Sequence, residues 1–456
     1  MAGERAAALR EVGRRQAFLF PRAMKDEIKH RMTRRLTGWD YCQRAIYMIT
    51  ITLADRTREW LGSLILTKNG EARNLPAKNG EAQNHGAVAA HSCAAIPATS
   101  GAACIEPTSF GEAVIDALME MPRLYPQVEI IEKQLMPEHF HFIIFVHEPL
   151  PKPLGALIRG FKAGAAKRWK ILAKNGEAQN QLAQNGEAQG KHTGDGTGRS
   201  AGAVAAHSCA AFPAWAEGFQ DTILFRDGQL KAMIAYLRDN PRRLAEKRAV
   251  PDLFRRVARI ALPLDGGRMT GHFEAIGNRH LLARPLHQVQ CSRRFFAYVR
   301  IPKPGGGLKI ARDAAGEPIT ASTSPEYAKR LADALAAAAH GAVIISPCIS
   351  DGERQIAREA LKRKLPLVTL QNKGFARLQK PVGRYFDACA EGRLLMMAPA
   401  AWPYTPQEKP MTRFAATALN RLCQWLVGED ALEINYHGMK PANIDQLAKV
   451  AAQVEK

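Results

Sequence analysis

Two histidines separated by one apolar residue, His139 and His141, are the strongest chemical feature of this 456-residue chain. They lie in the apolar run 135–146, and alternate side chains of an extended strand point to the same face. Both imidazoles are therefore expected on one side of a strand, close enough to bind one cation. The other side is expected to pack into a core through Phe140, Phe142, Ile144 and Val146.

A divalent ion held by two histidines needs at least one further ligand, and the segment 229–240 offers one. Its apolar residues recur at three- and four-residue spacing, which predicts a helix that Pro241 ends. Tyr236 and Asn240 are four residues apart and therefore share a helical face. His139, His141 and Asn240 would hold the metal, the metal would polarise a phosphate, and Tyr236 would attack it. A phenol has a pKa of about 10, so it needs a nearby cation or base to react.

Each of these residues also has a purely structural interpretation. A His-x-His pair can be incidental in a strand, and Tyr236 can be a half-buried helix tyrosine. Asn240 can be only a C-terminal helix residue before a proline. No nearby cysteine has a zinc-ligand spacing, which favours Mg²⁺ or Mn²⁺ over zinc. Glu138 is disfavoured as a ligand because its position in the strand points it to the opposite face.

Both segments resemble motifs of one known family. The residues 136–141 are similar to the histidine-hydrophobic-histidine (HUH) signature of single-tyrosine transposases. The residues 236–243 are similar to the tyrosine helix of the REP-associated branch of the insertion-sequence-200-like family, which has the form tyrosine, three residues, asparagine, proline. The flanks 47–53 and 221–230 resemble the opening strand and the approach to that helix. The resemblance covers about residues 40–260, with two interruptions.

This resemblance implies a fold and a reaction. The fold would be an α+β ferredoxin-like catalytic domain, an antiparallel sheet with helices on one face and the metal site on the open face. Mg²⁺ or Mn²⁺ would be the cofactor, and single-stranded or hairpin DNA the substrate. Tyr236 would form a 5′-phosphotyrosyl intermediate and leave a free 3′ hydroxyl, as in a transposase that nicks and transfers DNA strands. Whether Tyr236 acts in its own subunit or in a homodimer partner stays open.

The charge of the chain agrees with a nucleic-acid partner. It has 64 Lys and Arg against 43 Asp and Glu, a net charge of +21 and an isoelectric point near 9.8. Basic residues follow the tyrosine closely, where they could bind phosphates on either side of a scissile bond: Arg238, Arg242, Arg243, Lys247 and Arg248. The alternative is a solvated basic face, which a basic protein has in several places.

The chain is long enough for two or three domains. We expect a basic N-terminal extension (1–39), the transposase-like domain (40–260), a connecting module (261–310) and a C-terminal domain (311–456). No apolar run approaches the roughly 18 residues of a membrane span. The N-terminus lacks a secretory apolar core, and the cysteines form no CxxC pair. A cytoplasmic protein with reduced thiols is therefore expected.

Two repeat-containing inserts, 67–108 and 173–216, interrupt the transposase-like segment. The pentapeptide Lys68–Ala72 recurs at 78–82 and 174–178, and the unit 86–95 returns at 202–211. Such units are too few and too polar to stack a core, so we expect disordered surface loops. The duplication explains the repeated His and Cys residues more simply than metal binding does: His91, Cys93, His207 and Cys209.

The last third of the sequence predicts an α/β domain. A helix over 325–340, a second over 352–364 capped by Asp351, and buried strands at 342–346, 367–370 and 394–398 imply a parallel sheet. This pattern resembles the Rossmann-like domain of DNA-processing protein A. The turn 346–353 could receive a phosphate on its backbone N–H groups, although Asp351 and Glu353 oppose an anion. The alternative is a capped helix after a strand.

Two other functions remain open from the sequence. One is a domesticated DNA-binding protein that keeps the fold without strand transfer. The other is a nucleotide-sensing enzyme driven by the C-terminal domain, with the N-terminal part as a DNA tether. Neither explains why the histidines, the tyrosine and the asparagine occur together.

Overall fold

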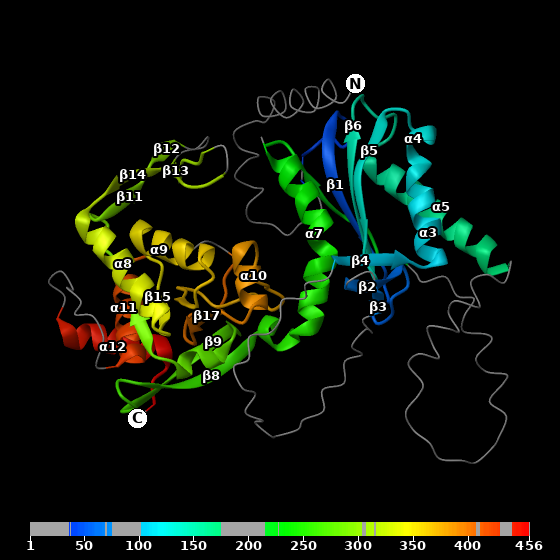
Figure 1. Ribbon diagram of the computed structural model, residues 1–456. Coiled ribbons are helices and arrows are strands. Elements are labelled where there is room, and N and C mark those ends of the chain that lie inside the picture. Colours follow the sequence, from blue (N-terminus) through cyan, green and yellow to red (C-terminus); the bar gives the residue numbers. More distant parts are fainter. Residues whose placement is uncertain are drawn as a thin grey trace, which may run out of the picture. The chain divides into compact units, whose positions relative to one another are not determined.

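A computed structural model describes most of the chain between residues 36 and 455, in two compact units divided between Ala245 and Glu246 (Figure 1). No helix in the described part is long and apolar enough to cross a membrane. Most of the N-terminal extension and most of both repeat inserts, with the repeated His and Cys residues, lie outside the described residues. The described residues are 36, 38–68, 71–74, 102–174, 215–226, 228–302, 307–313, 316–406, 411–428 and 440–455.

The N-terminal unit is built on a four-stranded antiparallel sheet in the order β5-β6-β1-β7. Its strands are β1 (Ala45–Thr52), β5 (Val128–Leu135), β6 (His139–Val146) and β7 (Gln220–Ile223). The helices of this unit are α3 (Ser109–Met119), α4 (Met121–Leu124), α5 (Leu154–Lys174) and α7 (Gln229–Ala249). The strands expected at 47–53 and 139–146 are confirmed.

The two central strands are apolar on both faces because each face is covered (Figure 1). On one face, α3 and α5 pack on the even-numbered residues of β6, as predicted for Phe140, Phe142, Ile144 and Val146. On the other face, Leu230, Met233, Ile234 and Leu237 of α7 pack against Ile143 and Phe145 of β6. The expectation of helices on one face only is therefore wrong: the apolar odd-numbered residues required a cover, and α7 provides it.

Helix α7 does not end at Pro241, which corrects the sequence prediction. It continues to Ala249 with the proline inside. Proline removes one backbone hydrogen bond, to the carbonyl of Leu237, and disfavours a helix. The following residues are strong helix formers, however, and Asp239 forms ion pairs across the proline with Arg242 (2.6 Å) and Arg243 (3.0 Å).

The first insert is not entirely a loop, which is a second correction. Three strands form an antiparallel sheet in the order β3-β2-β4: β2 (Gly62–Lys68), β3 (Glu71–Asn74) and β4 (Ala102–Pro107). The hydrogen bonds of β4 to β2 replace those that a solvated loop would make to water. At the second insert, α5 extends to Lys174, and Trp215 rejoins the fold through a bridge to Leu53.

The C-terminal unit contains a six-stranded mixed sheet in the order β10-β15-β16-β17-β9-β8. The first four strands are parallel, and β9 and β8 join them antiparallel. The strands are β8 (Val257–Leu264), β9 (Met269–Gly277), β10 (Leu286–Gln288), β15 (Val343–Ser346), β16 (Leu367–Leu370) and β17 (Leu394–Pro399). The predicted parallel strands of this unit are thus confirmed.

Helices cover both faces of this sheet (Figure 1). One face carries α8 (Pro325–Ala339), α9 (Asp351–Lys362) and α10 (Arg384–Ala390). The other carries α11 (Arg413–Val427) and α12 (Pro441–Ala452). Two 3-10 turns and two short ribbons complete the unit: η2 (Pro251–Phe254), η3 (Arg279–Ala283), β11 (Phe296–Tyr298) with β14 (Thr320–Thr323), and β12 (Arg300–Pro302) with β13 (Leu308–Ile310).

The segment 261–310 is not a separate connecting module in this structure. It supplies half of β8 and all of β9 and β10 to the six-stranded sheet. Residues 272–277 of β9 are buried throughout, because the strand lies between β17 and β8 and its side chains pack into hydrophobic clusters on both faces of the sheet. Apolar and polar residues do not alternate regularly in this stretch, because the strand is covered on both faces.

The N-terminus of α9 is occupied by protein groups. Ser350, and not Asp351 as predicted, caps the helix, and Glu353 completes a capping box. The buried Glu353 carboxylate accepts backbone N–H groups from Cys291 (3.2 Å), Ile349 (2.6 Å) and Ser350 (3.3 Å). Burial raises the pKa of Glu353 from its usual range. The N–H groups of Ile349 and Ser350 are therefore used internally, which favours the capped helix over a phosphate site.

Candidate metal and tyrosine site

The two histidines of β6 converge on one point. Their Nε2 atoms lie 3.0 Å apart, and their ring centres are 4.6 Å apart at an interplanar angle of 81°. Strand alternation places both on the face covered by α7. The register with β1 sets Thr50 opposite His141 and Thr52 opposite His139. The Thr50 hydroxyl oxygen lies 2.8 Å from His141 Nδ1, which leaves Nε2 directed at the other ring.

The two rings have different surroundings. His141 is only 7% exposed, and this burial, together with the neighbouring His139, lowers its pKa from 6.5 to about 3. It is therefore neutral at pH 7, the form in which imidazole binds a metal. The His139 side chain is 23% exposed, and its Nδ1 lies 3.2 Å from a carboxylate oxygen of Glu138. Glu138 precedes β6 and turns toward this ring, contrary to the expectation that it points away.

Helix α7 brings Tyr236 to the histidine pair from 95 residues further along the chain. The Tyr236 ring centre is 6.3 Å from that of His141, with the rings at 65°. The tyrosine is 39% exposed, so a solvent-borne substrate can reach its side chain. The guanidinium of Arg243 lies 5.8 Å from the centre of the tyrosine ring, a cation–π contact between residues about two helical turns apart that holds the ring in place.

Asn240 follows Tyr236 by one helical turn on the same face of α7. It is 8% exposed, and its Nδ2 atom is buried without a hydrogen-bond partner in the described part of the chain. The amide O and N can be exchanged without changing its shape, so this end of the side chain can equally present the oxygen. A buried polar atom without a partner costs about 1–3 kcal/mol. A ligand that satisfied it would remove that cost.

The spacing of the two histidine nitrogens is compatible with a small divalent cation. Two ligands at about 2.1 Å on adjacent corners of an octahedron are roughly 3.0 Å apart, as the Nε2 atoms are. The same separation fits an N–H···N hydrogen bond in the metal-free chain. No group of three or more His, Cys, Asp or Glu side chains suited to a metal occurs among the described residues, so the candidate set depends on the carboxamide of Asn240.

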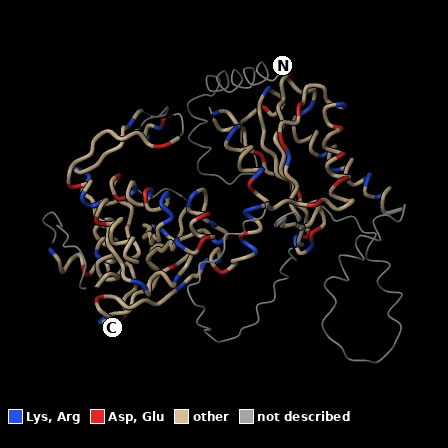
Figure 2. The backbone as a smooth tube through the Cα atoms, in the orientation of Figure 1, with Lys and Arg blue, Asp and Glu red and all other residues tan. Residues whose placement is uncertain are grey.

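The basic residues near the tyrosine are held in ion pairs on α7 and β5. Arg238 bonds to Glu132 of β5 at 2.7 Å, while its own side chain is 72% exposed. Arg242 and Arg243 share the carboxylate of Asp239. Lys247 and Arg248 lie in the last turn of the helix. Lys and Arg occur on elements of both units, so net charge alone does not locate a nucleic-acid surface (Figure 2).

Comparison of the chain with family models, with curated proteins and with solved structures gives no match. The functional assignment therefore rests on the residues and geometry of the site.

Three residues of the site were not predicted from the sequence, namely Thr50, Glu132 and Asp239, and Glu138 was expected on the wrong face of the strand. Thr50 acts through the strand register, and no local pattern reveals which residue of β1 lies opposite His141. Glu132 meets Arg238 only because α7 crosses the sheet near β5. Asp239 could have been recognised, because its spacing of three and four residues to Arg242 and Arg243 is typical of helical ion pairs.

Proposed function

We propose that this protein is a metal-dependent nickase and strand transferase of single-stranded DNA, of the single-tyrosine transposase type. The observation that carries the proposal is the convergence of His139 and His141 on β6 with Tyr236 on α7, which the fold brings to ring-centre distances of 4.6 Å and 6.3 Å. A buried Asn240 one turn from the tyrosine supports it.

In this proposal His139, His141 and Asn240 hold Mg²⁺ or Mn²⁺, and the bound cation would withdraw charge from the scissile phosphate. Thr50 fixes the His141 ring so that Nε2 faces the ligand position. The neutral state of His141, which burial enforces, keeps that nitrogen able to bind.

Tyr236 is the proposed nucleophile. Its phenolic oxygen forms a bond to phosphorus as the bond from phosphorus to the 3′ oxygen of the preceding nucleotide breaks. The phenol loses a proton and the departing 3′ oxygen gains one, which gives a 5′-phosphotyrosyl link and a free 3′ hydroxyl. In the second step, a DNA 3′ hydroxyl attacks the same phosphorus and releases the tyrosine, so two easier transfers replace one difficult one.

The topology of the N-terminal unit supports a ferredoxin-like fold for this domain. Within the four-stranded sheet, α3 lies in the chain between β1 and β5 and α5 lies between β6 and β7, and each of these strand pairs is two places apart in the sheet. For the C-terminal unit, the sequential order of four parallel strands supports a Rossmann-like domain, proposed as a nucleic-acid accessory module. The filled N-terminus of α9 argues against nucleotide sensing through a phosphate at that turn.

The basic residues of α7 are proposed to bind DNA phosphates. The Arg238 side chain is largely exposed and shares its charge with a single carboxylate. Arg242 and Arg243 both pair with Asp239 on the same helix. Phosphates would compete with Glu132 and Asp239 for these guanidinium groups.

The test is a covalent adduct assay. Purified protein is incubated with Mn²⁺ or Mg²⁺ and a pool of end-labelled single-stranded and hairpin oligonucleotides, and adducts are resolved by denaturing electrophoresis. We expect a metal-dependent adduct that Tyr236→Phe abolishes. Tyr404→Phe is the matched control: Tyr404 is 40% exposed and lies under Lys373 at 5.8 Å, much as Tyr236 lies under Arg243.

The alternative, a DNA-binding protein without strand transfer, predicts a different result. It would bind the same oligonucleotides and form no adduct with any of them. Adduct formation that survives Tyr236→Phe would also contradict the proposal, because the nucleophile would then be another residue.

A further inference from the structure

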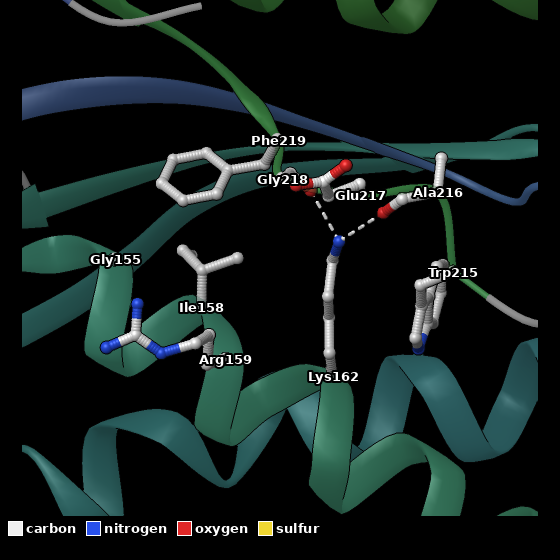
Figure 3. A pocket seen from close by; sticks show the side chains of 9 residues that line it. All are labelled: Gly155, Ile158, Arg159, Lys162, Trp215, Ala216, Glu217, Gly218 and Phe219. Atoms are coloured by element: carbon white, nitrogen blue, oxygen red, sulfur yellow. Dashed lines mark hydrogen bonds between the residues drawn. The ribbon is translucent and has the colours of Figure 1, made fainter.

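A pocket of about 550 Å³ lies on the N-terminal unit between α5 and the segment that leads into β7 (Figure 3). This volume is within the range of sites for small ligands. Its floor is one stripe of α5 with residues at helical spacing, and its wall is the stretch 215–219. The lining residues are Gly155, Ile158, Arg159, Lys162, Trp215, Ala216, Glu217, Gly218 and Phe219.

The pocket combines aromatic rings with cations. Figure 3 shows Phe219 and Trp215 above the helix, with Arg159 and Lys162 projecting from it. Lys162 donates to the carbonyl oxygens of Ala216 and Gly218 and lies 6.0 Å from the Trp215 ring centre, so it holds the wall in place. Arg159 is exposed, and none of the described residues pairs with its side chain. Glu217 is the one acid in the lining.

The wall of this pocket is joined by backbone bonds to the strand end that faces the histidines. Ala216 donates its N–H to the carbonyl of Thr52 (2.8 Å), and Thr52 is the ladder partner of His139. The residue directly after the wall, Gln220, pairs with Thr50, which contacts His141. The pocket and the histidine pair therefore adjoin the same end of β1.

We propose that this pocket binds one nucleotide of the single-stranded DNA flanking the scissile phosphate. A base can stack on the Phe219 and Trp215 rings, which accept any base through its π-face. The Arg159 guanidinium can bind the adjoining phosphate. This inference rests on the proposed function for the choice of DNA as ligand, but its chemistry needs only a base and a phosphate.

The experiment measures binding separately from cleavage. In the Tyr236→Phe protein, fluorescence anisotropy with labelled 12-nucleotide single strands gives Kd for Phe219→Ala, Arg159→Ala and the control Lys167→Ala. Lys167 is an exposed cation of α5 outside the pocket. We expect Phe219→Ala and Arg159→Ala each to raise Kd by at least about fivefold, and Lys167→Ala by less than about twofold.

A second readout locates the base. Single strands carrying 5-iodouracil at successive positions are irradiated, and the crosslinked peptides are identified by mass spectrometry. Crosslinks within 215–219 support the proposal. Unchanged Kd in both pocket variants, or an equal loss in Lys167→Ala, overturns it.

The two proposals can fail independently. If the parent protein forms the adduct and the pocket variants bind DNA as tightly as the parent does, the pocket proposal fails and the tyrosine proposal stands. If the pocket variants lose DNA binding and the parent protein forms no adduct, the tyrosine proposal fails and the pocket proposal stands.

Discussion

The hydroxyl oxygen of Thr50 lies 2.8 Å from Nδ1 of His141, its direct partner across the β1–β6 ladder. If Nδ1 carries the proton and donates it to Thr50, the lone pair of Nε2 is directed at His139. A hydrogen bond at the second nitrogen is the usual way in which proteins orient a metal-binding imidazole. The strand register thus prepares one ring for coordination before any ligand arrives.

Metal binding should depend on His139, His141 and Asn240. We expect each alanine variant to weaken Mn²⁺ binding by at least about tenfold, because a three-ligand set loses one donor. Isothermal titration calorimetry at pH 7.5 measures this without DNA. His147→Ala is the matched control, since His147 follows the same strand and bonds to the carbonyl of Pro126. Equal loss in His147→Ala would show that the effect is not specific to the site.

Asp239→Asn should tighten DNA binding. This carboxylate neutralises Arg242 and Arg243, and its removal adds one positive charge beside the tyrosine. We expect single-strand Kd to fall roughly two- to fivefold at low salt, with a steeper salt dependence. Loss of the surface ion pairs should cost under about 1 kcal/mol of stability. The control is Asp116→Asn on α3, which removes the same charge from an exposed position. Similar gains in both variants would indicate a general charge effect.

The stability of the metal-free protein should fall on acidification because of His141. Its folded pKa of about 3 is below the unfolded value of 6.5, so the unfolded chain binds more protons between these pH values. The resulting loss of folding stability is absent above pH 6.5 and grows as the pH falls toward 3. It should reach about 2 kcal/mol by pH 5.

The check for this prediction is denaturant unfolding of wild type and His141→Asn in EDTA at pH 7 and pH 5. Asparagine can keep a polar contact to Thr50 and does not titrate. The variant should lose about 2 kcal/mol less than wild type over this range. Parallel losses in the two proteins would contradict the assignment.

Two glycines of the N-terminal unit should respond oppositely to alanine. A Cβ at Gly111 of α3 would lie 1.8 Å from the carbonyl oxygen of Leu61, so backbone must move. We expect Gly111→Ala to destabilise by about 1–3 kcal/mol or more. At Gly160 of α5 a Cβ meets nothing within 4 Å, and Gly160→Ala should stabilise by about 0.5–1 kcal/mol. Thermal unfolding distinguishes them, and stabilisation by Gly111→Ala would rule out the close packing of α3 on Leu61.

Glu353→Ala should destabilise the C-terminal unit. The substitution leaves three buried backbone N–H groups without their acceptor, at a cost of about 1–3 kcal/mol. Glu326→Ala is the control, because Glu326 is an exposed carboxylate in the first turn of α8. Chemical denaturation measures both. If Glu353→Ala were as stable as Glu326→Ala, the N-terminus of α9 could accept an external anion after all.

Much of the fold was predictable from local pattern. The alternating side-chain directions of a strand at 139–146 predicted its two faces. The three- and four-residue spacing of Leu230, Met233, Ile234 and Leu237 predicted the apolar face of α7. The parallel strands at 367–370 and 394–398 followed from short apolar runs between helices. The end of α7 was predicted wrongly because only the local free-energy cost of a proline inside a helix was considered. Ion pairs that span the proline, together with packing on the sheet, outweigh that cost.

By itself, the sequence determined which groups can do chemistry: two imidazoles on one face of a strand, and a phenol and a carboxamide on one face of a helix. These relations depend only on backbone periodicity, which is local. The tertiary structure alone decided that these faces meet, that Thr50 orients His141, that Asp239 and Glu132 hold the arginines, and that a pocket adjoins the same strand end. Those contacts join residues far apart in the chain, and register and packing, which no local pattern encodes, fix them.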